Sequence, residues 1–200
     1  MLDQLGVADQ ILFHHDQFEF NDPTCPPHDW HFANRLRRYE GVDRLVYLER
    51  TPQDVMVSLY YQVTGRFNDF FHYQGSLSDF IRDDYFGAEN LQCFRLMWQE
   101  IAKHKPLLWI RYEDCHQNAE QVIRQVVDYY ELVVTDQQIR KAVAAASYEN
   151  MKALEASDEF HQPWLRLRQG APKVRKGKVN GYRDELSVDD QHYLHRIFTP

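Results

Sequence analysis

Three short apolar runs limit the folds open to this chain more than any other feature of its sequence. They are residues 11–13 (ILF), 45–48 (LVYL) and 107–110 (LLWI), and polar residues interrupt none of them. Such runs are typical of strands that are covered on both faces, as parallel strands are in an α/β sheet. The runs therefore predict an α/β fold with a parallel central sheet.

The segments between the runs carry signals for helices that would flank this sheet. The clearest begins with Thr51 as N-cap, Pro52 at the first helical position and Asp54 in the first turn, and it predicts a helix to about residue 65. Apolar stripes and capping residues predict further helices over residues 29–39, 90–103, 122–130 and 135–146, and one capped by Ser187.

The composition is that of a single folded domain. With 200 residues, of which 44% are hydrophobic and 14% aromatic, the chain has the length of one domain and the apolar content of a sizeable core. Nothing in the sequence marks a linker or a second domain. We therefore expect one domain over residues 1–200.

Charge and cysteine content exclude several classes of function. The formal net charge of −7 argues against a nucleic-acid-binding surface. Three cysteines without a CxxC pair favour reduced thiols and a cytoplasmic location. No segment approaches the about 18 apolar residues of a membrane span.

The histidine pairs 28/31 and 192/195 lack an evident third ligand, so we expect no bound metal.

Residues 160–183 form a basic stretch in this acidic chain. The stretch contains no acidic residue and carries seven of the 23 basic residues, namely Arg166, Arg168, Lys173, Arg175, Lys176, Lys178 and Arg183. Gly170, Pro172, Gly177 and Gly181 predict a loop, whose backbone N–H groups and cations suit a phosphate or sulfate. The alternative is a solvated loop without a ligand.

A second anion site is predicted where the run at residues 45–48 ends. Arg50 follows this strand, and the helix that begins beside it directs its N-terminal dipole into the crevice where α/β sheets bind ligands. Ser58, about two turns into the helix, could offer its hydroxyl to the same anion. The alternative is that Arg50 pairs with Glu49 or with another carboxylate.

Four segments, in order, resemble the sulfotransferases that use 3′-phosphoadenosine 5′-phosphosulfate (PAPS). They are RTPQDVMVS (residues 50–58), RYED (111–114), SYENMK (147–152) and RKGKV (175–179). The chain resembles the cytosolic, bacterial type of this family. The resemblance implies a P-loop-kinase-like sulfotransferase fold and a 3′-phosphate held by Arg50, Ser58, Arg175, Lys176 and Gly177.

The resemblance also assigns two aromatic residues to the adenine. It places Tyr112 near the base and Tyr148 stacked on it, and a tyrosine ring can stack on a base. Without the resemblance, both tyrosines would be interpreted as half-buried core residues.

The chain departs from the family pattern at its beginning. The family opens with a strand and a loop carrying Lys, Ser/Thr and Gly, which binds the 5′-phosphosulfate. No such loop is recognisable here, and the first lysine is Lys103. We therefore expect an N-terminally incomplete sulfotransferase fold, either a fragment or a natural remnant, and little transfer by these 200 residues alone.

Two histidines follow the run at residues 11–13. In similar sulfotransferases a histidine after the corresponding strand takes the proton from the acceptor hydroxyl, and imidazole suits this role because its pKa lies near neutrality. Family order favours His15 as the base, with His14 as the alternative and Asp16 as an orienting group.

The resulting hypothesis is a sulfotransferase that moves a sulfuryl group from PAPS, without a metal, to a hydroxyl or amine of a small-molecule or carbohydrate acceptor. Residues 66–86, rich in Phe, Tyr and Asp, would help to shape the acceptor pocket. The alternative is a non-catalytic remnant that binds adenosine 3′,5′-bisphosphate or serves as an interaction module. The dimer motif typical of the animal enzymes is not recognisable.

Overall fold

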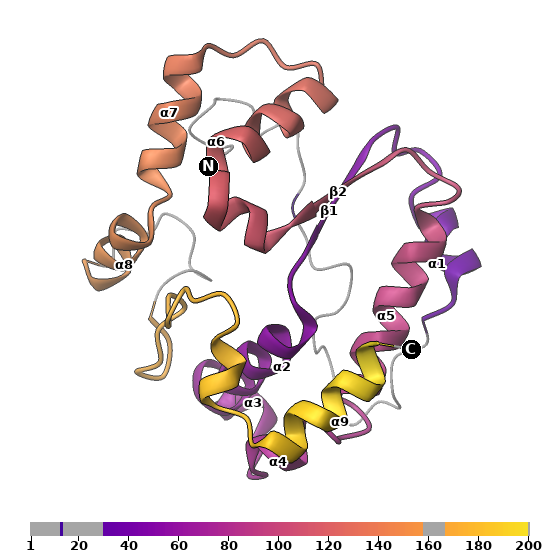
Figure 1. Ribbon diagram of the computed structural model, residues 1–200, viewed down its shortest axis with the longest axis vertical. Helices are drawn as coiled ribbons and strands as arrows, with labels where there is room; N and C mark the ends of the chain where they lie inside the picture. Colours follow the sequence, from indigo (N-terminus) through magenta and orange to yellow (C-terminus); the bar gives the residue numbers. More distant parts are fainter. Residues whose placement is uncertain (1–12, 14–29, 158–166, 200) are drawn as a thin grey trace. The chain divides into compact units, whose positions relative to one another are not determined.

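The computed structural model describes residue 13, residues 30–157 and residues 167–199. Within them, β1 (Leu45–Glu49) and β2 (Leu107–Arg111) form a parallel pair (Figure 1). The register runs from Leu45 opposite Leu107 to Glu49 opposite Arg111. This pairing confirms the α/β prediction for two of the three apolar runs. Residues 11 and 12 of the third run lie outside the described residues.

Helices make up most of the described chain. In chain order they are α1 (Phe32–Arg38), α2 (Pro52–Tyr61), a π-helical turn (Gln62–Arg66), α3 (Asn68–Phe71), α4 (Leu77–Phe80), α5 (Ala88–Ile101), α6 (Tyr112–Tyr129), α7 (Asp136–Ala145), α8 (Tyr148–Ala156), a 3-10 turn (Gly181–Asp184) and α9 (Val188–Phe198). No described helix has both the length and the apolar character needed to cross a bilayer.

The described residues fall into two compact units, each made of segments that are distant in sequence. The sheet unit contains residues 30–60, 74–111 and 180–199, with both strands, α1, α4, α5 and α9. The helical unit contains residues 61–73, 112–157 and 167–179, with α3, α6, α7 and α8. The single domain over residues 1–200 stays a prediction.

An aromatic core joins the strands of the sheet unit to α5. Side chains of a strand alternate between its two faces, so Tyr47 and Trp109, which are partners in the register, point to the same side. Their rings lie 4.5 Å apart, and Tyr47 lies 5.0 Å from Trp98 of α5. Phe94, Trp98 and Ile101 form a buried stripe at helical spacing on α5. α5 also packs against α1 and α9.

The strands are less covered than the apolar runs predict. Ile110 is buried, but its partner Leu48 is 58% exposed. In the described residues, the face of the sheet that bears Tyr47 packs on α5, whereas the face that bears Leu48 is only partly covered. An apolar run predicts a strand without a polar face, but it does not guarantee that other elements cover both faces of that strand.

α2 begins where the sequence predicts and ends in a π-helical turn. The carbonyl of Thr51 accepts the N–H of Val55, which is the first helical bond. At the other end, the N–H of Phe67 donates to the carbonyl of Gln62 at 2.9 Å, five residues back. This turn lies in the helical unit and carries Arg66, which is only 3% exposed.

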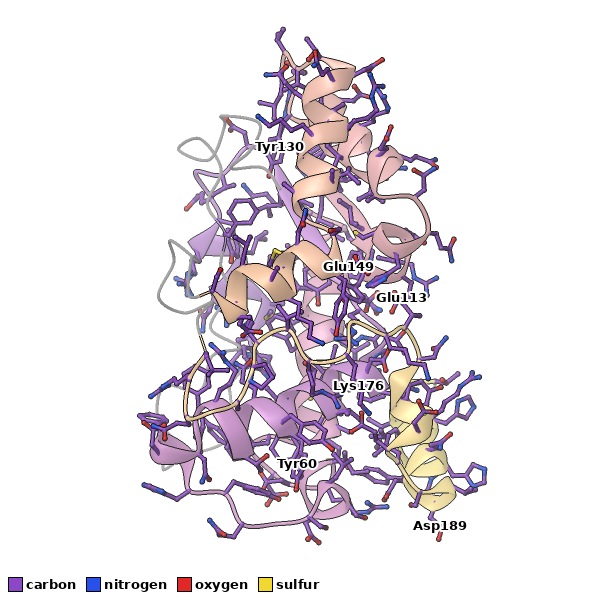
Figure 2. The ribbon with its side chains drawn as sticks, turned by 90° about the vertical axis from the view of Figure 1, so that its left-hand side faces the viewer. Tyr60, Glu113, Tyr130, Glu149, Lys176 and Asp189 are labelled. Carbon is purple, nitrogen blue, oxygen red and sulfur yellow. The ribbon has the colours of Figure 1, made fainter. Side chains whose placement is uncertain are left out.

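The core of the helical unit is formed by α6 and α7. Ile123 and Val127 of α6 pack on Ile139 and Ala142 of α7, and Figures 1 and 2 show the two helices side by side. α6 is kinked at Asn118, whose φ of −153° is not helical. The predicted capping box at the start of α7 and the predicted serine cap of α9 are both present.

Candidate functional site

Arg50 lies in the short connection between β1 and α2. Its Nη2 is 3.7 Å from Oδ2 of Asp54, and its side chain is 25% exposed. Glu49 has other partners, because Arg95 donates to it at 2.8 Å and Trp109 at 3.0 Å. The sequence left open a pairing of Arg50 with Glu49 or with another carboxylate; the structure pairs it with Asp54 of α2, and its side chain still reaches solvent.

Asp54 is buried in the first turn of α2 and accepts hydrogen bonds from a distant segment. The backbone N–H groups of Asn180 and Tyr182 donate to its two oxygens at 2.8 and 2.9 Å. Hydrogen bonds to a charged acceptor are stronger than neutral ones. Asp54 thus fixes both the guanidinium of Arg50 and the C-terminal end of the basic stretch.

Ser58 lies on α2, one turn beyond Asp54. Residues four apart share a face of an α-helix, so Ser58 lies on the same side of α2 as the Arg50–Asp54 pair. Its side chain is exposed. A hydroxyl in this position can donate to an anion that Arg50 also contacts.

In the helical unit, Tyr148 packs against Gly177 of the basic stretch. Tyr148 is the first residue of α8, after the N-cap Ser147, and its hydroxyl donates to the carbonyl of Arg175 at 3.1 Å. Gly177 has a φ of +56°, and a Cβ there would lie 2.6 Å from the ring of Tyr148. The structure therefore brings together Tyr148, Arg175 and Gly177, three of the residues that the sequence singled out.

The cations of this loop have different surroundings. The guanidinium of Arg175 lies 4.3 Å from the ring centroid of Tyr61, a cation–π contact that orients it. Lys176 and Lys178 are exposed, and Figure 2 shows Lys176 on the extended segment that runs beside α8. Tyr61 was not predicted from the sequence, because an aromatic residue at a helix end has no spacing that relates it to residue 175.

A carboxylate of α8 binds the chain just before this loop. Glu155 is 6% exposed and accepts hydrogen bonds from the backbone N–H groups of Lys173 and Val174, the second at 3.1 Å. Nη1 of Arg66 lies 3.9 Å from the same carboxylate. Burial lowers the pKa of Arg66, and the negative charge of Glu155 acts in the opposite direction. Glu155 was not among the residues predicted from the sequence.

The other predicted residues are placed as follows. Tyr112 begins α6, is half-buried and packs edge-on against His116, with ring centroids 4.6 Å apart. Arg50 and Ser58 belong to the sheet unit, whereas Tyr112, Tyr148, Arg175, Lys176 and Gly177 belong to the helical unit. His14 and His15, the candidate bases, lie outside the described residues.

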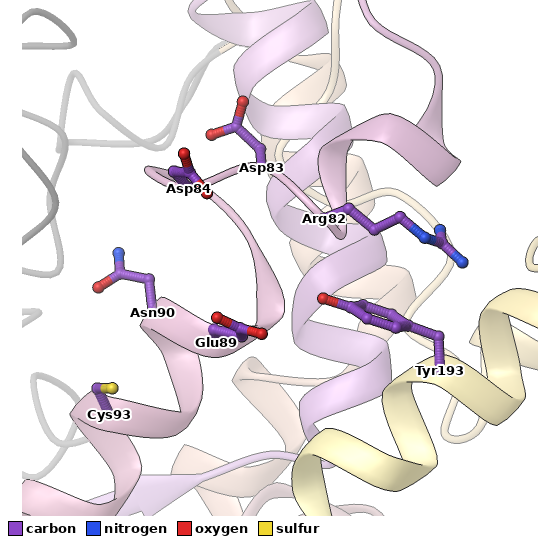
Figure 3. Close-up of a pocket in the computed structure, with 7 residues that line it drawn as sticks. All are labelled: Arg82, Asp83, Asp84, Glu89, Asn90, Cys93 and Tyr193. Atoms are coloured by element: carbon purple, nitrogen blue, oxygen red, sulfur yellow. The ribbon is translucent and has the colours of Figure 1, made fainter.

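The sheet unit also contains a pocket of about 320 Å³ that none of these residues lines (Figure 3). Its lining includes three acidic residues and one arginine, and consists of Arg82, Asp83, Asp84, Glu89, Asn90, Cys93 and Tyr193. The guanidinium of Arg82 lies 4.5 Å from the ring centroid of Tyr193. Among the described residues, no three His, Cys, Asp or Glu side chains form a group that could hold a metal ion.

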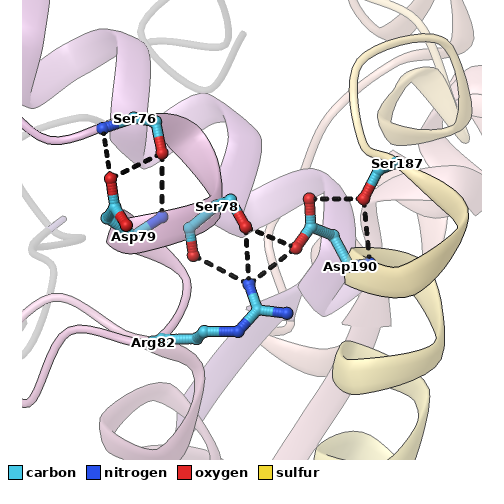
Figure 4. Close-up of polar contacts among 6 residues, drawn as sticks. All are labelled: Ser76, Ser78, Asp79, Arg82, Ser187 and Asp190. Atoms are coloured by element: carbon cyan, nitrogen blue, oxygen red, sulfur yellow. Dashed lines mark hydrogen bonds and ion pairs between the residues drawn. The ribbon is translucent and has the colours of Figure 1, made fainter.

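Arg82 is fixed on this pocket by a hydrogen-bond network between α4 and α9 (Figure 4). Asp190, 6% exposed, accepts hydrogen bonds from Arg82 at 2.6 Å, from Ser78 at 2.8 Å and from Ser187 at 2.7 Å. Burial acts to raise the pKa of Asp190, but the three hydrogen bonds outweigh it, so this pKa lies below its ordinary value.

The fold and the matching sequence place the chain among the sulfotransferases. Residues 42–200 match the sulfotransferase domain family, and the chain belongs to that family. Among curated relatives, it is 21% identical to mouse sulfotransferase 1B1 over 169 residues, covering 80% of this chain and 54% of that protein. It is 22% identical to bovine sulfotransferase 1E1 over 158 residues, covering 75% of this chain and 53% of that protein. The chain thus spans about half the length of these relatives.

Solved structures show the same fold. Mouse sulfotransferase SULT7A1 complexed with PAP has a TM-score of 0.65 at 20% identity, covering 84% of this chain and 58% of that one. Retinol dehydratase in a complex with retinol and PAP has a TM-score of 0.60 at 22% identity, covering 77% of this chain and 46% of that one. These structures confirm the predicted sulfotransferase fold.

We expect Gly177→Ala to destabilise the protein more than Gly170→Ala. Both glycines have positive φ, +56° and +73°, so each alanine costs about 1–2 kcal/mol of backbone strain. Only at position 177 would the new methyl group also meet a ring, whereas nothing lies within 4 Å at position 170. Urea unfolding of the two variants measures the difference. Equal losses of stability would show that Tyr148 does not pack against Gly177.

We expect Asp190→Asn to lower the free energy of unfolding at neutral pH by about 1.5–3 kcal/mol, the usual contribution of hydrogen bonds to a charged group. Because the folded-state pKa is lowered, this contribution is present above about pH 3.9, the ordinary value, and is lost as the pH falls below it. Urea titrations from pH 7 to pH 3 should show wild type and variant converging.

The matched control is Asp189→Asn, which removes the same charge from the same helical turn at an exposed position. It should change stability little at any pH. If both variants lost equal stability, the helix dipole and not the network would explain the effect.

Proposed function

We propose that this chain binds the adenosine 3′,5′-bisphosphate part of PAPS and acts in sulfuryl transfer to a hydroxyl or amine. The observation that carries the proposal is the arrangement around Gly177, where Tyr148 holds a loop whose cations include Arg175 and the exposed Lys176. Membership of the sulfotransferase family and the PAP complexes of two structural neighbours support it.

In this proposal the 3′-phosphate is bound by Arg50, Ser58, Arg175, Lys176 and Gly177. Arginine presents a planar fork of donors that matches a phosphate, which lysine does not reproduce. The guanidinium of Arg50 is oriented by Asp54, and that of Arg175 by Tyr61. The absence of a side chain at Gly177 would let the phosphate approach the backbone N–H groups of the loop.

Tyr112 and Tyr148 would contact the adenine. The ring of Tyr148 is fixed at its hydroxyl, which donates to the carbonyl of Arg175, and along one edge, which packs on Gly177. A ring held in one orientation loses little further freedom when a base stacks on it. This supports Tyr148 as the stacking residue.

In the transfer step, the acceptor oxygen forms a bond to sulfur while the bond from sulfur to the 5′-phosphate oxygen breaks. The electron pair of that bond remains on the phosphate of the leaving bisphosphate, and the acceptor proton passes to His15, with His14 as the alternative base. The acceptor would be a small molecule or a carbohydrate. Retinol dehydratase has been solved with bound retinol and with bound androsterone, and these complexes support an apolar small-molecule acceptor.

The proposed setting is the cytoplasm, and the proposed chemistry needs no metal. Cys93 and Cys115 are both free thiols in the structure. The relatives of this chain are sulfotransferases of the 1B1 and 1E1 types.

Calorimetry with adenosine 3′,5′-bisphosphate and 5′-AMP tests the nucleotide assignment. We expect tighter binding of the bisphosphate, and a ten- to hundredfold loss in Arg50→Ala and in Arg175→Ala, because one charge-assisted contact contributes about 1.5–3 kcal/mol. Arg140→Ala, on an exposed position of α7, is the control for the loss of one positive charge. Equal affinity of the wild type for the two nucleotides would refute the assignment.

A second experiment measures transfer from labelled PAPS to a panel of alcohols and amines. We expect little transfer by the 200-residue chain, and activity when a strand and a Gly-Lys-Ser/Thr loop are supplied before it, because a cation must neutralise the leaving phosphate oxygen. In the active form, His15→Ala should abolish transfer. Loss in His14→Ala with full activity in His15→Ala would move the base by one residue. Binding without transfer in every form would favour the non-catalytic remnant.

A further inference from the structure

The backbone that enters the basic loop is bound by a single side chain of α8. Lys173 donates its N–H to Oε1 of Glu155, and Val174 donates its N–H to Oε2. Each oxygen of the carboxylate therefore takes one of two consecutive N–H groups. A planar carboxylate bound in this way fixes both the position and the direction of the chain immediately before Arg175.

The same helix holds the loop at a second point. Tyr148 lies seven residues before Glu155, which is two helical turns, so the two side chains share a face of α8 and start about 10 Å apart. Tyr148 binds the carbonyl of Arg175, and Glu155 binds the two N–H groups that precede it. Three consecutive residues of the loop are thus tied to one face of one helix.

Burying Glu155 requires compensation, and the surroundings supply it. A carboxylate with 6% of its residue surface exposed is costly unless it is paired and hydrogen-bonded. Arg66, from the π-helical turn, has its Nη1 at 3.9 Å and is itself buried. A carboxylate used only to neutralise Arg66 would not need its two oxygens on backbone N–H groups.

We propose that Glu155 is a positioning residue for the 3′-phosphate site. By fixing residues 173 and 174 on α8, it sets where the guanidinium of Arg175 and the N–H of Gly177 lie before the nucleotide arrives. The inference rests on the proposed function, since it concerns the same phosphate. In this proposal Glu155 does not contact the nucleotide. Because it acts only through the loop that binds the 3′-phosphate, substituting Glu155 should weaken binding only of nucleotides that carry a 3′-phosphate.

The test compares Glu155→Gln with Glu149→Gln in the full chain. Glu155→Gln keeps the shape of the side chain but replaces one acceptor by an NH₂ group, so one backbone N–H loses its partner. Glu149 is the matched control, because it lies exposed on the first turn of the same helix (Figure 2). Circular dichroism establishes that each variant is folded, and calorimetry measures the affinities for adenosine 3′,5′-bisphosphate and for 5′-AMP.

We expect Glu155→Gln to weaken binding of the bisphosphate about tenfold, as for the loss of one hydrogen bond to a charged group, and to leave 5′-AMP within about twofold of wild type. Glu149→Gln should change neither affinity. Unchanged bisphosphate affinity in Glu155→Gln, or an equal loss for both nucleotides, would overturn the inference. A wild type that binds both nucleotides equally would instead refute the proposed function.

A paired variant separates positioning from charge compensation and covers the case in which Glu155→Gln is unfolded. Arg66→Met with Glu155→Gln removes both buried charges together, which is often neutral for stability. If Glu155 positions the loop, this variant is folded and still shows the selective loss for the bisphosphate. If Glu155 only neutralises Arg66, the double variant regains wild-type affinity and the inference fails.

Discussion

The buried carboxylate of Asp54 is the interaction on which the anion site of the sheet unit depends. It contacts the guanidinium of Arg50 and accepts two backbone N–H groups, from Asn180 and Tyr182. A carboxylate that is only 2% exposed is costly to bury unless it is paired and hydrogen-bonded, and these donors meet that requirement. The end of β1, the start of α2 and the chain that leads to α9 therefore meet at one side chain. In a protein with a net charge of −7, the acids that matter most to the proposed site are those turned inward.

Glu155 applies the same chemistry in the helical unit, since it too uses both of its oxygens on backbone N–H groups that lie close together in the chain. A flexible cationic loop loses conformational entropy whenever it closes on a ligand. Glu155 binds the residues before positions 175–178, and Asp54 binds residues after them. These two anchors reduce the number of conformations that the loop must give up. Each anchor acts within its own unit, so the local geometry of the two ends is defined separately.

Local signals made several elements predictable. β1 and β2 follow from their apolar runs, and α2 and α7 follow from Thr51-Pro52 and from the capping box at Thr135, because these patterns act over a few residues. The anchors were not predictable. Asp54 reaches a backbone N–H 126 residues away, and every residue except proline carries such a group, so nothing in the sequence marks the partner. The resemblance identified Arg175 and Tyr148, but it could not show that Tyr61 orients one and Gly177 packs against the other.

The π-helical turn at residues 62–66 determines the direction in which Arg66 points. Such a turn contains one residue more than an α-helical turn, and one residue corresponds to a rotation of about 100° around the helix axis. Arg66 lies buried at the last position of this turn. Removing one residue between 62 and 65 would restore a regular helix and rotate position 66 by about a quarter-turn or slightly more, away from its present direction. The partner of Glu155 is therefore selected by the count of residues in one helical turn as much as by the identity of the side chain.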